Sequence, residues 1–176
     1  MTLKGETMQI SLIKELKSLY TGEGFSSISF FLIWLYCCFN HEYLQIARQP
    51  HIALPVITLC FILFVGTYFW KLMLNIVSVG HKMHLTTKQN RLFVFFKHLS
   101  IILLVICSML FIYAIVTKRD YIYFGLFLFA FAFVEYINYF HIRLSYLTPR
   151  EFRALLKHRR LRKSHLNRVM HEEATD

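Results

Sequence analysis

Hydrophobic and polar residues follow one another in long blocks along this chain. Four apolar runs stand out, at about residues 25–43, 52–75, 92–116 and 121–142. Each approaches or exceeds the ~20 residues that a helix needs to cross the hydrocarbon layer of a membrane. Because the links between the runs are short, neighbouring runs are expected to be antiparallel. The pattern predicts an all-α fold, an integral membrane four-helix bundle formed by residues 25–142.

The first of these runs is the least apolar. Ser26, Ser27 and Ser29 open it, and Cys37 to Asn40 close it. A re-entrant segment is therefore an alternative to a full crossing. Because the run begins late and no small-residue cleavage site follows it, we expect it to be retained and to act as its own insertion signal.

The segment before the first run, residues 1–24, is expected to be a cytoplasmic interfacial segment. Within it, a helical periodicity places Lys14 and Lys17 on one side and four apolar residues on the other. These apolar residues are Ile10, Ile13, Leu16 and Tyr20. This pattern predicts a short helix lying in the membrane interface. The glycines of Thr21–Gly24 are expected to end that helix.

The segment after the fourth run, residues 143–176, is strongly basic. Thr148 can cap a helix, Pro149 suits the first helical position and Glu151 completes a capping box. We expect a basic amphipathic cytoplasmic helix that contacts anionic lipids of the inner leaflet or a protein partner. Its cationic residues are Arg150, Arg153, Lys157, Arg159, Arg160, Arg162, Lys163 and Arg168. Alternatively, these charges only set the topology; nucleic-acid binding is disfavoured, because Phe152 is the helix's single aromatic residue.

Composition and charge agree with the membrane assignment. Of 176 residues, 56% are hydrophobic and 17% aromatic, and the net charge is +10. Sixteen Lys and Arg residues lie before the first run, from Lys71 near the end of the second run to Arg91, or after the fourth run, whereas three lie in the other two links. The positive-inside rule therefore predicts a multi-pass protein of the cytoplasmic (plasma) membrane with both termini in the cytoplasm.

A few polar residues fall inside the apolar runs. In the fourth run Glu135, Asn138 and Tyr139 share one helical face, which is expected to point into the bundle, whereas Phe140 lies on the opposite face. A straight antiparallel pairing of the third and fourth runs places Lys97 level with residue 137. An ion pair between Lys97 and Glu135 would offset the cost of placing each charge in a membrane. The alternative is that Glu135 binds a proton or a cation.

Histidines and cysteines were considered as sites of metal or redox chemistry. His81, His84, His98 and His141 are expected near the cytoplasmic face, where imidazoles could bind a metal or haem. However, no His-x-x-x-His spacing places two ligands on one helical face, so no cofactor is expected. The four cysteines form no Cys-x-x-Cys pair, and they are expected to behave as small apolar residues.

The motifs of common enzymes do not occur in the sequence. There is no nucleotide-binding loop, no Gly-x-Ser-x-Gly elbow and no zinc-protease helix. Four short helices also leave little room for an enclosed active site. The leading hypothesis is therefore non-enzymatic: an accessory subunit, an envelope or stress regulator, or an oligomeric effector, acting as a homo-oligomer or with a larger membrane protein. A small proton- or cation-coupled transporter or channel using Glu135 is the alternative, and a metal- or haem-dependent membrane enzyme comes third.

Overall fold

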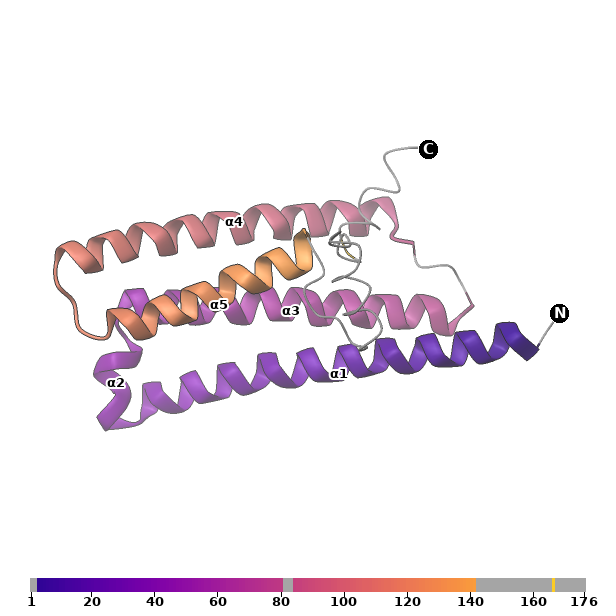
Figure 1. The fold of residues 1–176 in the computed structure, drawn as a ribbon, viewed down its shortest axis with the longest axis horizontal. Helices are drawn as coiled ribbons and strands as arrows, with labels where there is room; N and C mark the ends of the chain where they lie inside the picture. Colours follow the sequence, from indigo (N-terminus) through magenta and orange to yellow (C-terminus); the bar gives the residue numbers. More distant parts are fainter. Residues whose placement is uncertain (1–2, 81–83, 142–165, 167–176) are drawn as a thin grey trace, which may run out of the picture.

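The computed structural model describes residues 3–80, 84–141 and Leu166, with side chains from Ile10 onward. These residues form helices and no strand: α1 (Leu3–Phe39), α2 (His41–Ala47), α3 (Pro50–Ser78), α4 (Thr87–Val116) and α5 (Ile122–Phe140) (Figure 1). All but α2 are long and apolar enough to cross a membrane, which confirms the four predicted spans at this level of detail. Apart from Leu166, the predicted C-terminal basic helix lies outside the described residues.

The four long helices lie side by side, with α3 in the centre (Figure 1). We call the end of the bundle that contains α2 the distal end, and the opposite end, where α1 begins, the proximal end. Helix α3 runs antiparallel to α1 and α4 and parallel to α5, and it packs against all of them. Gly125 near the start of α5 allows this helix to approach the backbone of His51 at the start of α3.

Local sequence signals explain where several helices begin. The side chain of Asn40 caps α2 by accepting a hydrogen bond from the backbone N–H of Glu42 at 3.1 Å. Pro50 occupies the first turn of α3, and Thr86 and Gln89 form a capping box at the start of α4. These caps satisfy backbone groups that a helix end leaves open.

Helix α1 continues without interruption through Thr21–Gly24, so the predicted break at these residues is wrong. A break would leave backbone N–H and C=O groups without hydrogen bonds, which is costly where water is scarce. Glycine is therefore tolerated inside helices that enter a membrane, although it favours turns in water. The predicted interfacial helix is consequently the first part of one helix of 37 residues.

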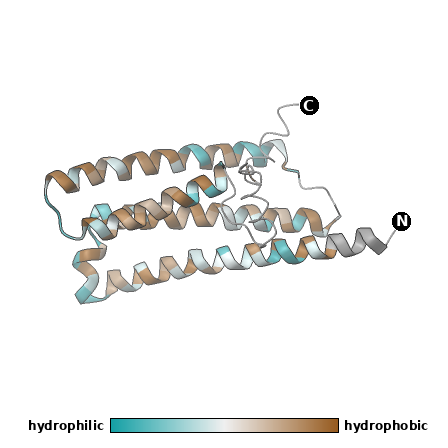
Figure 2. Ribbon diagram, viewed as in Figure 1, coloured by the Kyte–Doolittle hydropathy of each residue, from teal (hydrophilic) through white to brown (hydrophobic). Residues whose placement is uncertain are grey.

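The main hydrophobic core lies along α3 and continues toward the proximal end. Leu59, Ile62 and Met73 of α3 are fully buried there, together with Phe93 of α4. Phe140 is only 1% exposed, so its predicted outward position is wrong: at the end of α5 its ring packs beside Tyr136 in this core. Figure 2 shows apolar residues along most of α3, α4 and α5 and in the distal part of α1, whereas hydrophilic residues lie mainly near the helix ends and in the proximal half of α1.

Candidate functional site

A buried polar cluster joins α1, α3 and α5. Trp70 of α3 donates a hydrogen bond from Nε1 to Oε1 of Glu23 on α1, at 2.8 Å. The side chain of Tyr139 on α5 lies beside the same carboxylate and interacts with it. The second oxygen of Glu23, Oε2, is buried and accepts no hydrogen bond from the described residues. Glu23 thus connects three helices through one carboxylate.

Gly66 of α3 creates the space that Tyr139 occupies. A Cβ at this position would overlap the ring and hydroxyl of Tyr139. The absence of a side chain at Gly66 therefore lets the 5% exposed Tyr139 ring lie directly against the α3 backbone, within reach of Glu23. Small residues commonly allow such close approach between membrane helices.

A second carboxylate belongs to the same region. Asn138 donates a hydrogen bond from Nδ2 to Oε2 of Glu135 at 3.3 Å. The charge of Glu135 acts on both Glu23 and Tyr139. Among the described residues, neither carboxylate forms an ion pair with a lysine or arginine. Two neighbouring carboxylates with little cationic compensation are costly in a membrane protein, which makes this cluster the strongest candidate site for proton or cation chemistry.

Lys97 lies farther toward the proximal end than the sequence suggested. Phe111 of α4 contacts positions 125 and 129 of α5, so it is level with about residue 127. Counting equally from there along both helices brings Lys97 level with His141, on which its charge acts, and not with residue 137. The predicted Lys97–Glu135 ion pair does not form between these two described residues. Helix crossing and the turn between α4 and α5 shift the register, which a straight pairing ignores.

His141 lies just beyond the end of α5 and contacts the same helix. Its Nε2 is 3.1 Å from the hydroxyl of Tyr136. Partial burial, and then the positive charge of Lys97, lower the pKa of His141. The proximal end of α5 therefore has a histidine for which the neutral form is favoured.

Part of the polar cluster was predictable from the sequence. Helical periodicity placed Glu135, Asn138 and Tyr139 on one face; in the structure Tyr139 is buried and Asn138 donates a hydrogen bond to Glu135. The one carboxylate not predicted was Glu23, because the flanking glycines suggested a break there. The spacing of Glu23 with Ser27, one helical turn later, carried a signal: both face α3, and Ser27 donates a hydrogen bond to the backbone oxygen of Cys60 at 3.5 Å.

The predicted histidine site is not assembled by the residues that the structure describes. His84 and His98 are exposed, and Nδ1 of His98 lies 2.8 Å from the backbone oxygen of Val94 in its own helix. His81 lies outside the described residues. In residues 10–80 and 84–141, no three His, Cys, Asp or Glu side chains gather closely enough to hold a metal ion.

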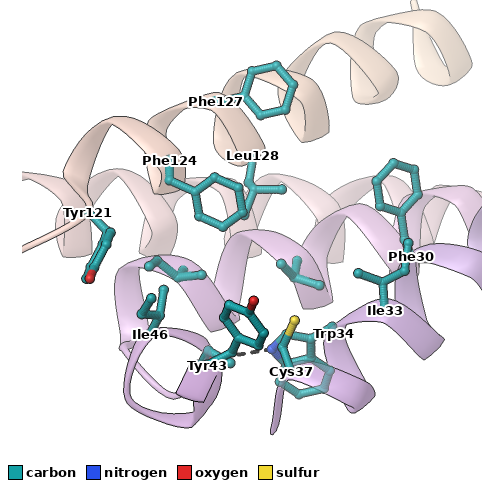
Figure 3. A pocket seen from close by; sticks show the side chains of 13 residues that line it. Phe30, Ile33, Trp34, Cys37, Tyr43, Ile46, Tyr121, Phe124, Phe127 and Leu128 are labelled. Carbon is teal, nitrogen blue, oxygen red and sulfur yellow. Dashed lines mark hydrogen bonds between the residues drawn. The ribbon is translucent and has the colours of Figure 1, made fainter. Parts of the chain in front are cut away.

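An apolar cavity of about 520 Å³ lies in the distal half of the bundle (Figure 3). Its walls come from α1, α2, the start of α3, and the start of α5. The cavity is distinct from the polar cluster, with which it shares no residue. Its lining consists of Phe30, Ile33, Trp34, Cys37, Tyr43, Ile46, Ala47, Ile52, Val56, Tyr121, Phe124, Phe127 and Leu128.

A smaller and more polar cavity of about 120 Å³ lies at the distal end between α3 and α4. Gln49, His51 and Arg119 contribute to its lining. His51 lies 3.0 Å, through Nε2, from the backbone oxygen of Asp120. The buried Oε1 of Gln49 has no hydrogen-bond partner among the described residues. Polar groups therefore lie at the same end of the bundle as the apolar cavity.

Comparisons with protein-family models, with curated proteins and with solved structures gave no match to this chain.

Proposed function

We propose that this chain is a small multi-pass protein of the cytoplasmic membrane that works by association, with α1 as its contact helix inside the membrane. The observation that carries this proposal is the poor burial of α1. Of its side chains from Ile10 to Phe39, only that of Leu16 is fully buried, whereas α3 buries side chains along its whole length. A helix packed on one side only has most of its surface available to another membrane helix.

The surface of α1 also has the residue types that favour such contacts. Ser18, Gly22 and Ser26 repeat at one-turn spacing, and nothing lies within 4 Å of where a Cβ of Gly22 would stand. Ser26 donates its hydroxyl to the backbone oxygen of Gly22 at 3.0 Å, so this polar group is satisfied inside the helix. Small residues at this spacing let two membrane helices approach closely, with van der Waals packing as the main attraction.

The basic segment 143–176 provides the second contact in this proposal. With both termini in the cytoplasm, as the charge distribution favours, its cations would face the anionic inner leaflet or an acidic surface on the associated protein. The associated molecule is either a larger membrane protein or further copies of this chain. In this arrangement the protein acts as an accessory subunit, a regulator or an oligomeric effector.

Substitution of Gly22→Leu tests the association. Because the space above Gly22 is open in the single chain, the substitution is expected to leave folding intact and to block close helix contact. The full-length protein would be purified in mild detergent, and its oligomeric state and co-purifying proteins measured. Ala130→Leu on the exposed face of α5 is the matched control. If G22L retains the same assembly as A130L, α1 is not the contact helix.

A second candidate function is proton- or cation-coupled transport through the polar cluster. The specific observation in its favour is the buried Oε2 of Glu23, which lacks a hydrogen bond from the described residues, close to a second carboxylate at Glu135. A carboxylate in such surroundings is suited to bind and release a proton or cation. Transport would require further copies of the chain, because four helices alone enclose little space.

Proteoliposomes containing a pH-sensitive dye would test this second function. We expect Glu23→Gln and Glu135→Gln to assemble normally and to lose proton flux, whereas Glu42→Gln at the exposed distal end keeps it. A loss of folded protein in the first two variants, without any wild-type flux, would assign the cluster a purely structural role between helices.

A further inference from the structure

We propose that the apolar cavity in the distal half of the bundle binds one acyl chain of an anionic glycerophospholipid. The cavity has the size that such a chain requires. An apolar cavity of about 150 Å³ holds one benzene molecule, so the 520 Å³ seen here would hold on the order of twenty carbons. This corresponds to one long acyl chain.

The lining of the cavity favours hydrocarbon over water. Apart from the thiol of Cys37 and the hydroxyls of Tyr43 and Tyr121, the lining is hydrocarbon, and Nε1 of Trp34 already donates to the backbone oxygen of Ala47 at 3.4 Å (Figure 3). A cavity without several free polar groups gives water little to bind and is filled by apolar matter or left empty. An acyl chain satisfies the lining without leaving a polar group unpaired.

The rim of the cavity faces outward from the bundle. Ile33 on α1 is 61% exposed, and Phe127 on α5 is 65% exposed. Helices α1 and α5 approach each other at the ring contact between Phe30 and Phe131, which lies on the proximal side of the cavity. A lipid chain can therefore enter laterally from the hydrocarbon layer, a route that a water-soluble ligand does not have.

Charges at the distal end favour an anionic headgroup. Arg48 follows Ala47, which lines the cavity. Lys118 and Arg119 lie three and two residues before Tyr121, which also lines it. Two carboxylates, of Glu42 and Asp120, lie in the same region, so the cations exceed the anions by one. All five side chains are exposed at the same end of the bundle as the cavity, where they could contact the phosphate of a lipid whose chain fills it.

Adjacent cysteines provide a matched pair of variants. The Cys37 side chain reaches the cavity, as Figure 3 shows, whereas Cys38, the next residue of α1, does not line it. Cys37→Phe should therefore fill part of the cavity, and Cys38→Phe adds the same volume on another face of the helix. Both side chains are half-buried, so the two variants make similar demands on folding.

Lipid retention is the first test. Full-length wild type, C37F and C38F would be purified from membranes containing phosphatidylglycerol, and phospholipid bound per chain measured by native mass spectrometry. We expect one phospholipid on wild type and C38F, and roughly tenfold less on C37F, because an extra ring removes space for the chain. The proposal would be overturned if C37F and C38F retained equal amounts of lipid or if the wild type carried none. It would also be overturned by a lipid-free dimer in which Cys37 is protected from thiol labelling.

Tryptophan fluorescence gives an independent test. Trp34 lines the cavity and Trp70 does not, so Trp70→Phe leaves Trp34 as the only tryptophan. In micelles titrated with dibrominated phosphatidylglycerol, we expect quenching of Trp34 that saturates at one lipid per chain and becomes several-fold weaker with C37F. Quenching that is linear in lipid and indifferent to C37F would show only surface contact and overturn the proposal.

Discussion

Helices α1 and α3 resemble each other in sequence pattern but differ sharply in their surroundings. Both are long enough to cross a membrane. In its most apolar stretch about half of the residues of α3 are buried and α3 contacts every other helix, whereas no residue in the corresponding stretch of α1 is fully buried. Hydropathy thus identifies a membrane helix without showing whether protein or lipid surrounds it. That distinction depends on where small and polar residues allow close helix contact.

Truncation of one leucine on each helix should reveal the largest difference in stability between α3 and α1. Leu59 on α3 is fully buried and Leu32 on α1 is 54% exposed. Leu59→Ala should lower the free energy of unfolding by about 2–5 kcal/mol, because it leaves a cavity in the packed centre. Leu32→Ala should lower it much less, since lipid can replace the lost contacts. Unfolding in mixed micelles measures both; equal losses would mean that α1 is packed against an unseen neighbour.

Glycine-to-alanine substitutions should change stability in opposite directions on the two helices. Gly66→Ala places a Cβ against Tyr139 and is expected to cost about 1–3 kcal/mol through overpacking. Gly22→Ala meets open space and should stabilise α1 by about 0.5–1 kcal/mol, because alanine favours helix. Thermal unfolding in detergent compares the two variants with wild type. A destabilised G22A would contradict the open face of α1.

The hydrogen bond between Glu23 and Trp70 is expected to contribute about 1 kcal/mol to the free energy of unfolding, less than the preceding effects. Hydrogen bonds between membrane helices usually contribute about this much. A double-mutant cycle with Glu23→Ala and Trp70→Phe measures the coupling between α1 and α3 at this point. The same cycle with Trp34→Phe in place of Trp70→Phe is the control, because Trp34 bonds to the backbone of Ala47. Zero coupling for the first pair would mean that Glu23 does not fix α1 to α3.

The smallest expected effect is a pH dependence at the proximal end. Since partial burial and Lys97 lower the pKa of His141 in the folded state, the unfolded chain binds the proton more tightly. Stability should therefore fall as the pH is lowered through about 6.5, the ordinary value for histidine. His141→Gln should remove this part of the dependence, whereas His98→Gln retains it. The free energy of unfolding, measured at pH values about one unit apart between pH 5 and 8, provides the test.

Local and periodic features of this fold could be predicted from the sequence. The four spans follow from long apolar runs, and the inward position of Tyr139 follows from helical periodicity. The continuity of α1 could not be predicted from Gly22 and Gly24, because glycine ends helices in water and not reliably in lipid. The position of Lys97 depends on how α4 and α5 cross, which involves residues distant in sequence. Glu23 was not predicted because its flanking glycines suggested a helix end. Its hydrogen bond to Trp70 was not predicted because it joins residues distant in sequence.

Helix α5 is much shorter than α1, which implies that lipid would surround one part of the bundle and water the other. At 1.5 Å per residue α5 is about 28 Å long, close to the hydrocarbon thickness, whereas α1 is about 55 Å long. In the proposed membrane arrangement the proximal parts of α1, α3 and α4 would extend past the hydrocarbon, and Leu16, Met73, Val77 and Phe93 pack together in this part of the core. Water around this part would then drive its packing, so the proximal core should weaken on cooling and in urea as a soluble domain does.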